Sequence, residues 1–129
     1  MKWISRTVLF GGVALALALG FQPALAHHSG AGFNSDEVKE ITGTIKEFQF
    51  TNPHTWIQVW VTGSNGQREE WSVEWGSPNS LARQGVRPST FPPGAEVTIR
   101  MNPMANGSAA GGFVGAKLAD GTTVGRWQE

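Results

Sequence analysis

The three histidines are the residues of this chain best suited to bind a metal ion, and two of them are adjacent. His27 and His28 directly follow an apolar N-terminal stretch, whereas His54 comes after an Asn-Pro pair that is typical of a turn. Cleavage after Ala26 would give His27 a free α-amine. This amine and Nδ1 of the same residue can close a six-membered chelate on one metal ion, and His54 or His28 would add a third nitrogen. Imidazole and amine nitrogens suit Cu(II), which favours tetragonal geometry, so the pattern predicts a copper site.

This arrangement resembles the histidine brace of periplasmic copper carriers and copper monooxygenases. The same residues also have a simpler interpretation. A polar arm at a chain terminus is often disordered, and His54 after Asn-Pro can serve only to hydrogen-bond its own turn. The copper hypothesis therefore depends on cleavage directly before His27.

Sulfur ligands offer a second hypothesis for a metal site. Met101 and Met104 flank the end of an expected strand, and with His54 and Trp56 they would form a soft site for Cu(I). Against this, Met101 alternates in phase with the apolar residues before it, which favours a place in the core.

The tryptophans suggest a function without a metal. In the expected strand 56–62, Trp56 and Trp60 oppose the face that carries Ile57, Val59 and Val61. If the aliphatic face is the core, both tryptophans are partly exposed and can dock a protein, a peptide or a glycan. The alternative is that the strand bends and both indoles cover a second small core.

The composition excludes several classes of function. The chain has no Cys, which rules out disulfides, thiolate metal sites and thiol nucleophiles, and equal numbers of basic and acidic residues argue against nucleic-acid binding. Glu70 and Glu74 flank Ser72 on one strand face, but a solvated face explains them better than a carboxylate pair of a glycosidase. We therefore expect a binding protein, not an enzyme, whose partner is an unknown protein, small molecule or metal.

The first 26 residues have the three parts of a secretory signal peptide. Lys2 and Arg6 are followed by the apolar run 8–20 and by Ala24-Leu25-Ala26, where a signal peptidase would cleave. The run is shorter than the roughly 20 residues that a spanning helix needs. We expect a periplasmic protein with no stable membrane anchor after cleavage.

The remaining chain has the pattern of a small all-β domain. Residues 27–37 form an expected flexible arm, and residues 38–129 a single domain with strands at 41–50, 56–62, 70–75, 96–101 and 113–118. A change of phase near Lys46-Glu47 predicts a bulge in the first strand. A short helix over 77–85 lies between the third and fourth strands. This order predicts a five-stranded OB-like barrel, with a small antiparallel sheet crossed by a helix as the alternative.

Several short motifs resemble those of a family of small, secreted bacterial proteins known as a domain of unknown function. The most specific of them is Thr-Asn-Pro-His-x-Trp at 51–56. The others are His27-His28-Ser29, Gly43-Thr44-Ile45, Trp75-Gly76-Ser77-Pro78-Asn79 and Pro93-Gly94-Ala95-Glu96-Val97. The resemblance covers essentially the whole expected mature chain and implies the fold and the secreted location, but no catalytic residues.

Overall fold

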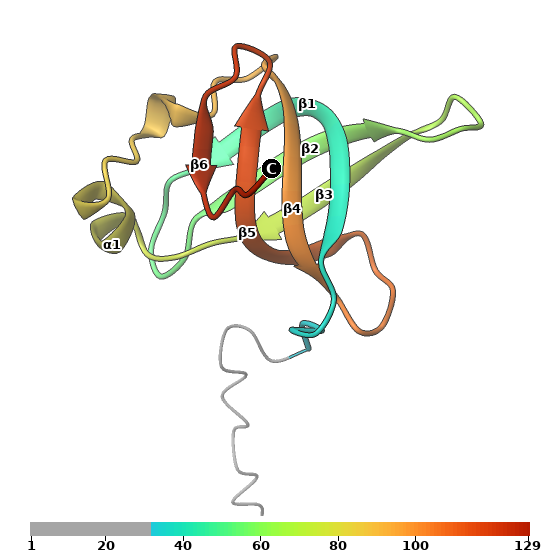
Figure 1. Cartoon of the computed structure of the whole chain (residues 1–129), viewed down its shortest axis with the longest axis horizontal. Coiled ribbons are helices and arrows are strands. Elements are labelled where there is room, and N and C mark those ends of the chain that lie inside the picture. Colours follow the sequence, from blue (N-terminus) through green and yellow to red (C-terminus); the bar gives the residue numbers. More distant parts are fainter. Residues whose placement is uncertain (1–31) are drawn as a thin grey trace, which may run out of the picture.

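The computed structural model describes residues 32–129, so the expected signal peptide, His27 and His28 lie outside the described residues. Six strands and two short helices follow one another along this part of the chain (Figure 1). They are β1 (Lys39–Gln49), β2 (Trp56–Thr62), β3 (Arg68–Glu74), α1 (Pro78–Arg83), the 3-10 helix η1 (Pro88–Thr90), β4 (Glu96–Pro103), β5 (Ala110–Leu118) and β6 (Thr123–Gly125).

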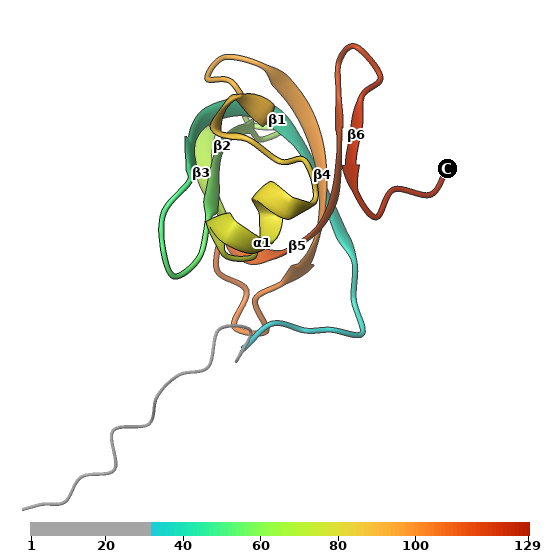
Figure 2. The same ribbon diagram turned by 90° about the vertical axis from the view of Figure 1, so that its left-hand side faces the viewer.

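Five of the strands close into a barrel. The sheet order is β3-β2-β1-β4-β5-β6, and a parallel pairing of β3 with β5 joins the two sides. The first three strands form an antiparallel meander, and β1 also pairs with β4. This is the OB-type barrel that the order of elements predicts, with α1 between the third and fourth strands. Figure 2 shows α1 lying across one end of the barrel.

Strand β1 pairs with β4 through its first half and with β2 through its second half, and a bulge bends it. Its register with β2 shifts between Ile45 and Glu47, which confirms the bulge expected near Lys46-Glu47. Beyond the shift, Phe48 packs against the same core as Ile45, although the two residues differ in phase. One strand can therefore line two sides of the barrel.

The core is made of aliphatic and aromatic side chains that alternate along the strands. Trp71 and Val73 are buried in it, and Trp75 packs against it, as their shared phase in the sequence predicts. The buried cluster consists of Ile41, Ile45, Ile57, Val59, Trp71, Val73, Phe91, Val97, Ile99, Met101 and Ala116.

Local signals fix both ends of α1. The Ser77 side chain accepts a hydrogen bond from the Ser80 N–H at 3.3 Å, and Pro78 occupies the first helical position. Gly85 follows the helix with φ of +86°, a conformation that glycine adopts without strain. Leu81 is almost fully buried, so α1 is held against the barrel through its apolar side.

The sequence over 102–112 is rich in glycine and alanine and suggests a loop, but much of it is strand. Strand β4 continues to Pro103 and β5 begins at Ala110, so the connection is much shorter. The glycines that suggest a loop are needed here for close packing. A Cβ at Gly111 would lie 2.5 Å from Met101 Sδ, nearer than real side chains approach. In residues 32–129, neither helix has the length and apolar character to span a membrane.

Candidate functional site

His54 lies in the turn between β1 and β2, and backbone contacts hold this turn in place. The Asn52–Pro53 peptide bond is cis. The Thr51 hydroxyl donates a hydrogen bond to the His54 carbonyl at 3.3 Å. The motif Thr-Asn-Pro-His therefore forms one compact turn that ends at the histidine.

Thr55 ties this turn to the end of β3. Its side chain is fully buried, and both its N–H and its hydroxyl donate to the Gly76 carbonyl, at 3.0 and 3.1 Å. The Trp75 N–H donates in return to the Thr55 carbonyl at 2.9 Å. These bonds fix the backbone beside His54 against the segment that follows Glu74.

The imidazole of His54 is paired with the carboxylate of Glu74. Its Nδ1 lies 2.9 Å from Glu74 Oε1, and the side chains of His54 and Glu74 are 30% and 13% exposed. Glu74 stands directly opposite Trp56 in the β2–β3 register. The carboxylate is thus the more buried partner, and the imidazole reaches the surface.

An open depression of about 340 Å³ surrounds this pair. It is lined by Phe33, His54, Glu74, Trp75, Gly76, Asn102, Gly112 and Phe113. These residues come from the N-terminal arm, the β1–β2 turn and strands β3, β4 and β5. The closure of the barrel therefore brings together segments that are far apart in the sequence.

The described part of the N-terminal arm is attached to the barrel next to His54. Phe33 forms an isolated antiparallel bridge with Met104, and the Asn34 N–H donates to the Pro103 carbonyl at 2.8 Å. The Phe33 ring lies against Gly112, where an added Cβ would come within 2.8 Å of the ring. The described part of the arm is therefore anchored at Phe33, beside the depression.

The two methionines of the alternative Cu(I) site have different surroundings in the structure. Met101 is fully buried in the core, so its thioether cannot reach a ligand unless the barrel opens. Met104 lies beside the arm, where a Cβ at Gly32 would be 3.2 Å from its terminal methyl. Within residues 32–129, no group of three or more His, Asp or Glu side chains is placed to hold a metal ion.

Trp56 and Trp60 are half-buried, and they alternate with the buried Ile57 and Val59 along β2. Two cations lie over the Trp60 ring, with Lys46 Nζ 4.9 Å and Arg68 Cζ 4.6 Å from the ring centroid. This distance is typical of cation–π contacts. This indole is thus already covered in part by side chains of the same molecule.

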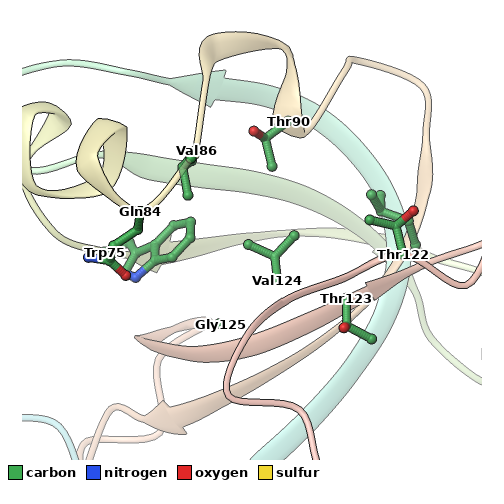
Figure 3. A pocket seen from close by; sticks show the side chains of 10 residues that line it. Trp75, Gln84, Val86, Thr90, Thr122, Thr123, Val124 and Gly125 are labelled. Carbon is green, nitrogen blue, oxygen red and sulfur yellow. The ribbon is translucent and has the colours of Figure 1, made fainter.

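A second cavity, of about 410 Å³, lies between the segment after α1 and the β5–β6 hairpin (Figure 3). Trp75, Gln84, Val86, Thr90 and Val124 are among the residues that line it. The described residues around it include no charged side chain, so this cavity has neither a metal ligand nor a counter-ion. Trp75 lines both cavities.

The carboxyl groups with a lowered pKa do not belong to the depression around His54. A hydrogen bond from the Thr122 N–H lowers the pKa of Asp120, in the turn between β5 and β6. A hydrogen bond from Lys117 lowers the pKa of Glu129 at the C-terminus.

Sequence reasoning missed two residues of this site, Glu74 as the partner of His54 and Phe33 as the anchor of the arm. Glu74 had a usable signal. Counting back from the Gly63–Gly66 hairpin pairs Trp56 with Glu74, which places the carboxylate beside the histidine that precedes Thr55. Phe33 had none, because its contacts with Met104 and Gly112 are distant in sequence.

Comparison with known proteins identifies a family and finds similarity to a solved structure. Residues 15–113 match the family of unknown function DUF6152. The chain belongs to this family. No curated protein matches this DUF6152 member. Among solved structures, a crystal structure of the mitochondrial single-stranded DNA binding protein Rim1 from S. cerevisiae is similar, with 13% identity and a TM-score of 0.49. The similarity covers 64% of this chain and 93% of the other.

Proposed function

We propose that this DUF6152 protein binds Cu(II) in the periplasm, as a carrier or sensor. The ligands are the α-amine and imidazole of His27, freed by removal of residues 1–26, and the imidazole of His54. The observation that carries this proposal is that the arm anchor Phe33 and His54 line the same depression.

The length of the chain before the anchor supports this ligand set. The six residues 27–32 cover at most about 20 Å when fully extended, and a shorter path suffices to return to a depression that Phe33 itself lines. His28 lies on the same short segment, so it remains the alternative source of the third nitrogen.

The chemistry of the donors also favours copper. Two imidazoles and an amine form an all-nitrogen set, and Cu(II) binds such sets more strongly than the other common divalent ions. Met101, the soft ligand that would suit Cu(I), is buried in the core. The site would therefore hold the oxidised ion.

The ligand role of His54 can be tested with the processed protein. We expect one equivalent of Cu(II) to give an electron paramagnetic resonance spectrum with about three nitrogen ligands. His54→Ala should change this spectrum and weaken binding, whereas His28→Ala should leave both unchanged. The reverse result would assign the third nitrogen to His28, and no stoichiometric binding by the wild-type protein would refute the proposed function.

A second candidate function is recognition of a non-metal ligand on the outer face of β2 and β3. The supporting observation is that the half-buried Trp56 and Trp60 lie on the same face of β2, with the polar Gln58 between them. The amide oxygen of Gln58 accepts a hydrogen bond from the Ser72 hydroxyl. In OB-type barrels, the face of strands 2 and 3 binds oligosaccharides and oligonucleotides. The acidic character expected after loss of Lys2 and Arg6 favours a neutral glycan over an anionic polymer.

This candidate predicts a different pattern of mutant effects. Soluble oligosaccharides should produce a saturable change in tryptophan fluorescence that Trp60→Ala removes and His54→Ala does not. A change that persists in Trp60→Ala would rule out this face.

A further inference from the structure

The barrel closes along only part of one edge of β5. Strand β4 pairs along the other edge, so β3 and β6 share this one, β3 beside residues 110–112 and β6 beside residues 115–117. The pairing with β3 stops at Glu74, and Trp75 follows it where β6 takes over the edge. The cavity of about 410 Å³ in Figure 3 lies at this change of partner, with the segment after α1 on its other side. This space is the seam cavity.

The floor of the seam cavity is apolar. Val86 is buried, and Leu118 and Val124 pack against the barrel core. Phe113 lies against the Trp75 indole, with ring centroids 4.1 Å apart, and the part of the indole that Phe113 leaves open lines the cavity. Figure 3 shows Trp75, Val86 and Val124 directed into the same space. An apolar ring placed here would remove apolar surface of both partners from water.

Two side chains at the rim have hydrogen-bonding capacity to spare. The Thr90 hydroxyl accepts from the Arg87 N–H at 2.8 Å, a bond that leaves its own proton available to donate. Gln84 Nε2 donates to the Ser80 carbonyl at 3.3 Å, a bond that leaves the amide oxygen of Gln84 available to accept. The rim therefore offers a donor and an acceptor, which is the combination that a hydroxyl group uses.

The outer edge of β6 adds backbone groups to this rim. The Leu118 N–H donates to the Thr122 carbonyl at 2.9 Å, which makes these two residues a hydrogen-bonded pair of the β5–β6 ladder. Because such pairs alternate along an antiparallel ladder, Thr123 and Gly125 direct their N–H and C=O groups away from β5. Strand β6 is last in the sheet order, so within residues 32–129 no further strand pairs with these groups.

The walls of the seam cavity carry no charge. Among the described residues that line it, none is Asp, Glu, Lys, Arg or His, whereas the other depression contains His54 and Glu74. A charged ligand would lose hydration here without gaining a counter-ion. The volume of about 410 Å³ falls within the range of small-molecule pockets, roughly 300–1,000 Å³. Size and charge together therefore select a small, uncharged ligand.

We propose that the seam cavity binds a small uncharged molecule that combines an apolar ring with a hydroxyl group. The ring contacts Trp75, Val86 and Val124 on the floor, and the hydroxyl exchanges hydrogen bonds with the polar groups of the rim. The cavity includes neither His54 nor the outer face of β2, so this inference stands whether or not either function proposed above holds.

Benzyl alcohol is a minimal probe of this chemistry, and benzoate is its matched anion. In ¹H–¹⁵N correlation spectra of the processed protein, benzyl alcohol should shift the amide signals of Gly85, Val86 and Val124 in a saturable manner. The expected Kd is on the order of 1 mM for a ligand of so few atoms. Benzoate should bind roughly tenfold more weakly or worse, because its charge has no partner in the cavity. Shifts confined to other residues, or equal binding of benzoate, would overturn the proposal.

Two substitutions on β6 locate the site. Val124 packs against the core and lines the cavity, so Val124→Phe should fill the space and abolish the shifts caused by benzyl alcohol. Successive side chains of a strand face opposite sides, so Thr123→Phe adds the same ring outside the cavity and should retain wild-type affinity. Binding that persists in Val124→Phe would refute the site.

The remaining outcomes are also decisive. Circular dichroism spectra of both variants should match the wild type, and should Val124→Phe fail to fold, the comparison of the two probes on the wild-type protein decides. The outer edge of β6 could instead pair with a second copy of this chain. Sedimentation velocity would then show a dimer that forms with increasing concentration, benzyl alcohol would leave the cavity amides unshifted, and the proposal would fail.

Discussion

Copper affinity should fall by on the order of a hundredfold or more when three alanines are added before His27, an extension that leaves no histidine at the third position, where the terminal amine and an imidazole could form a new Cu(II) site. The extension moves the free amine away from the imidazole of His27 and turns the original nitrogen into an amide, so the six-membered chelate is lost. Chelation through linked ligands raises affinity by roughly 10²- to 10⁴-fold, and this gain disappears when geometry prevents simultaneous binding. Competition titration of Cu(II) against a chelator of known affinity measures the effect.

The wild-type processed protein and the His28→Ala variant serve as references for this experiment. Both keep the terminal amine next to an imidazole at position 27 and should bind with similar affinity. Equal affinity of the extended and the processed proteins would eliminate any site built on the N-terminus. His54 and Glu74 would then be a structural pair of the turn.

The largest loss of stability should come from Phe91→Ala, at about 3–5 kcal/mol. The Phe91 side chain is fully buried, and its ring makes edge-on contacts with Phe48, Phe113 and Trp75, with centroids 5.2, 6.3 and 6.4 Å away. Truncation leaves a cavity that these rings can fill only in part. Urea unfolding should show a lower midpoint with an unchanged slope.

Val38→Ala is the control for this measurement, because Val38 is 58% exposed and should change the free energy of unfolding by less than about 0.5 kcal/mol. A Phe91→Ala protein within about 1 kcal/mol of the wild type would show that the three neighbouring rings collapse into the space, and that Phe91 is not central to the core.

Strand positions were predictable because alternation is a local signal. Strand β2 has the expected bounds 56–62, and the phase change in β1 correctly indicated its bulge. The cap at Ser77 and the glycine at position 85 located α1 in the same way. Each of these features is encoded within a few residues of where it acts.

Features that depend on contacts distant in sequence could not be derived in this way. Phe91 lies inside a proline-rich loop, between Pro88 and Pro92, with no periodic pattern, yet it is fully buried among three aromatic rings from β1, the end of β3 and β5. Gly111 and Gly112 suggest a loop, but they serve the packing of Met101 and Phe33. The sequence contains these residues, but not the closure of β3 onto β5 that gives them their roles.

The candidate site also combines features that local sequence predicts with features that depend on distant contacts. His54 was selected from its residue type and its turn, and Trp60 from its strand phase. The pairing of His54 with Glu74 depends on the register between two strands, and the proximity of the arm depends on the bridge between Phe33 and Met104. The copper ligands His27 and His28 lie outside the described residues, so their role remains a prediction.

The bridge at Phe33 has a further consequence for any ligand on the segment before it. A terminus confined within about 20 Å of a fixed point has a local concentration in the millimolar range at His54, however dilute the protein is. Copper captured by either partner would therefore meet the other without a second encounter in solution. Contacts of Phe33 with Met104 and Gly112 would then set the retention time of the ion, although none of these three residues touches it. A partner that lifted Phe33 from Gly112 would weaken the hold of His54 on the metal without competing for a single ligand.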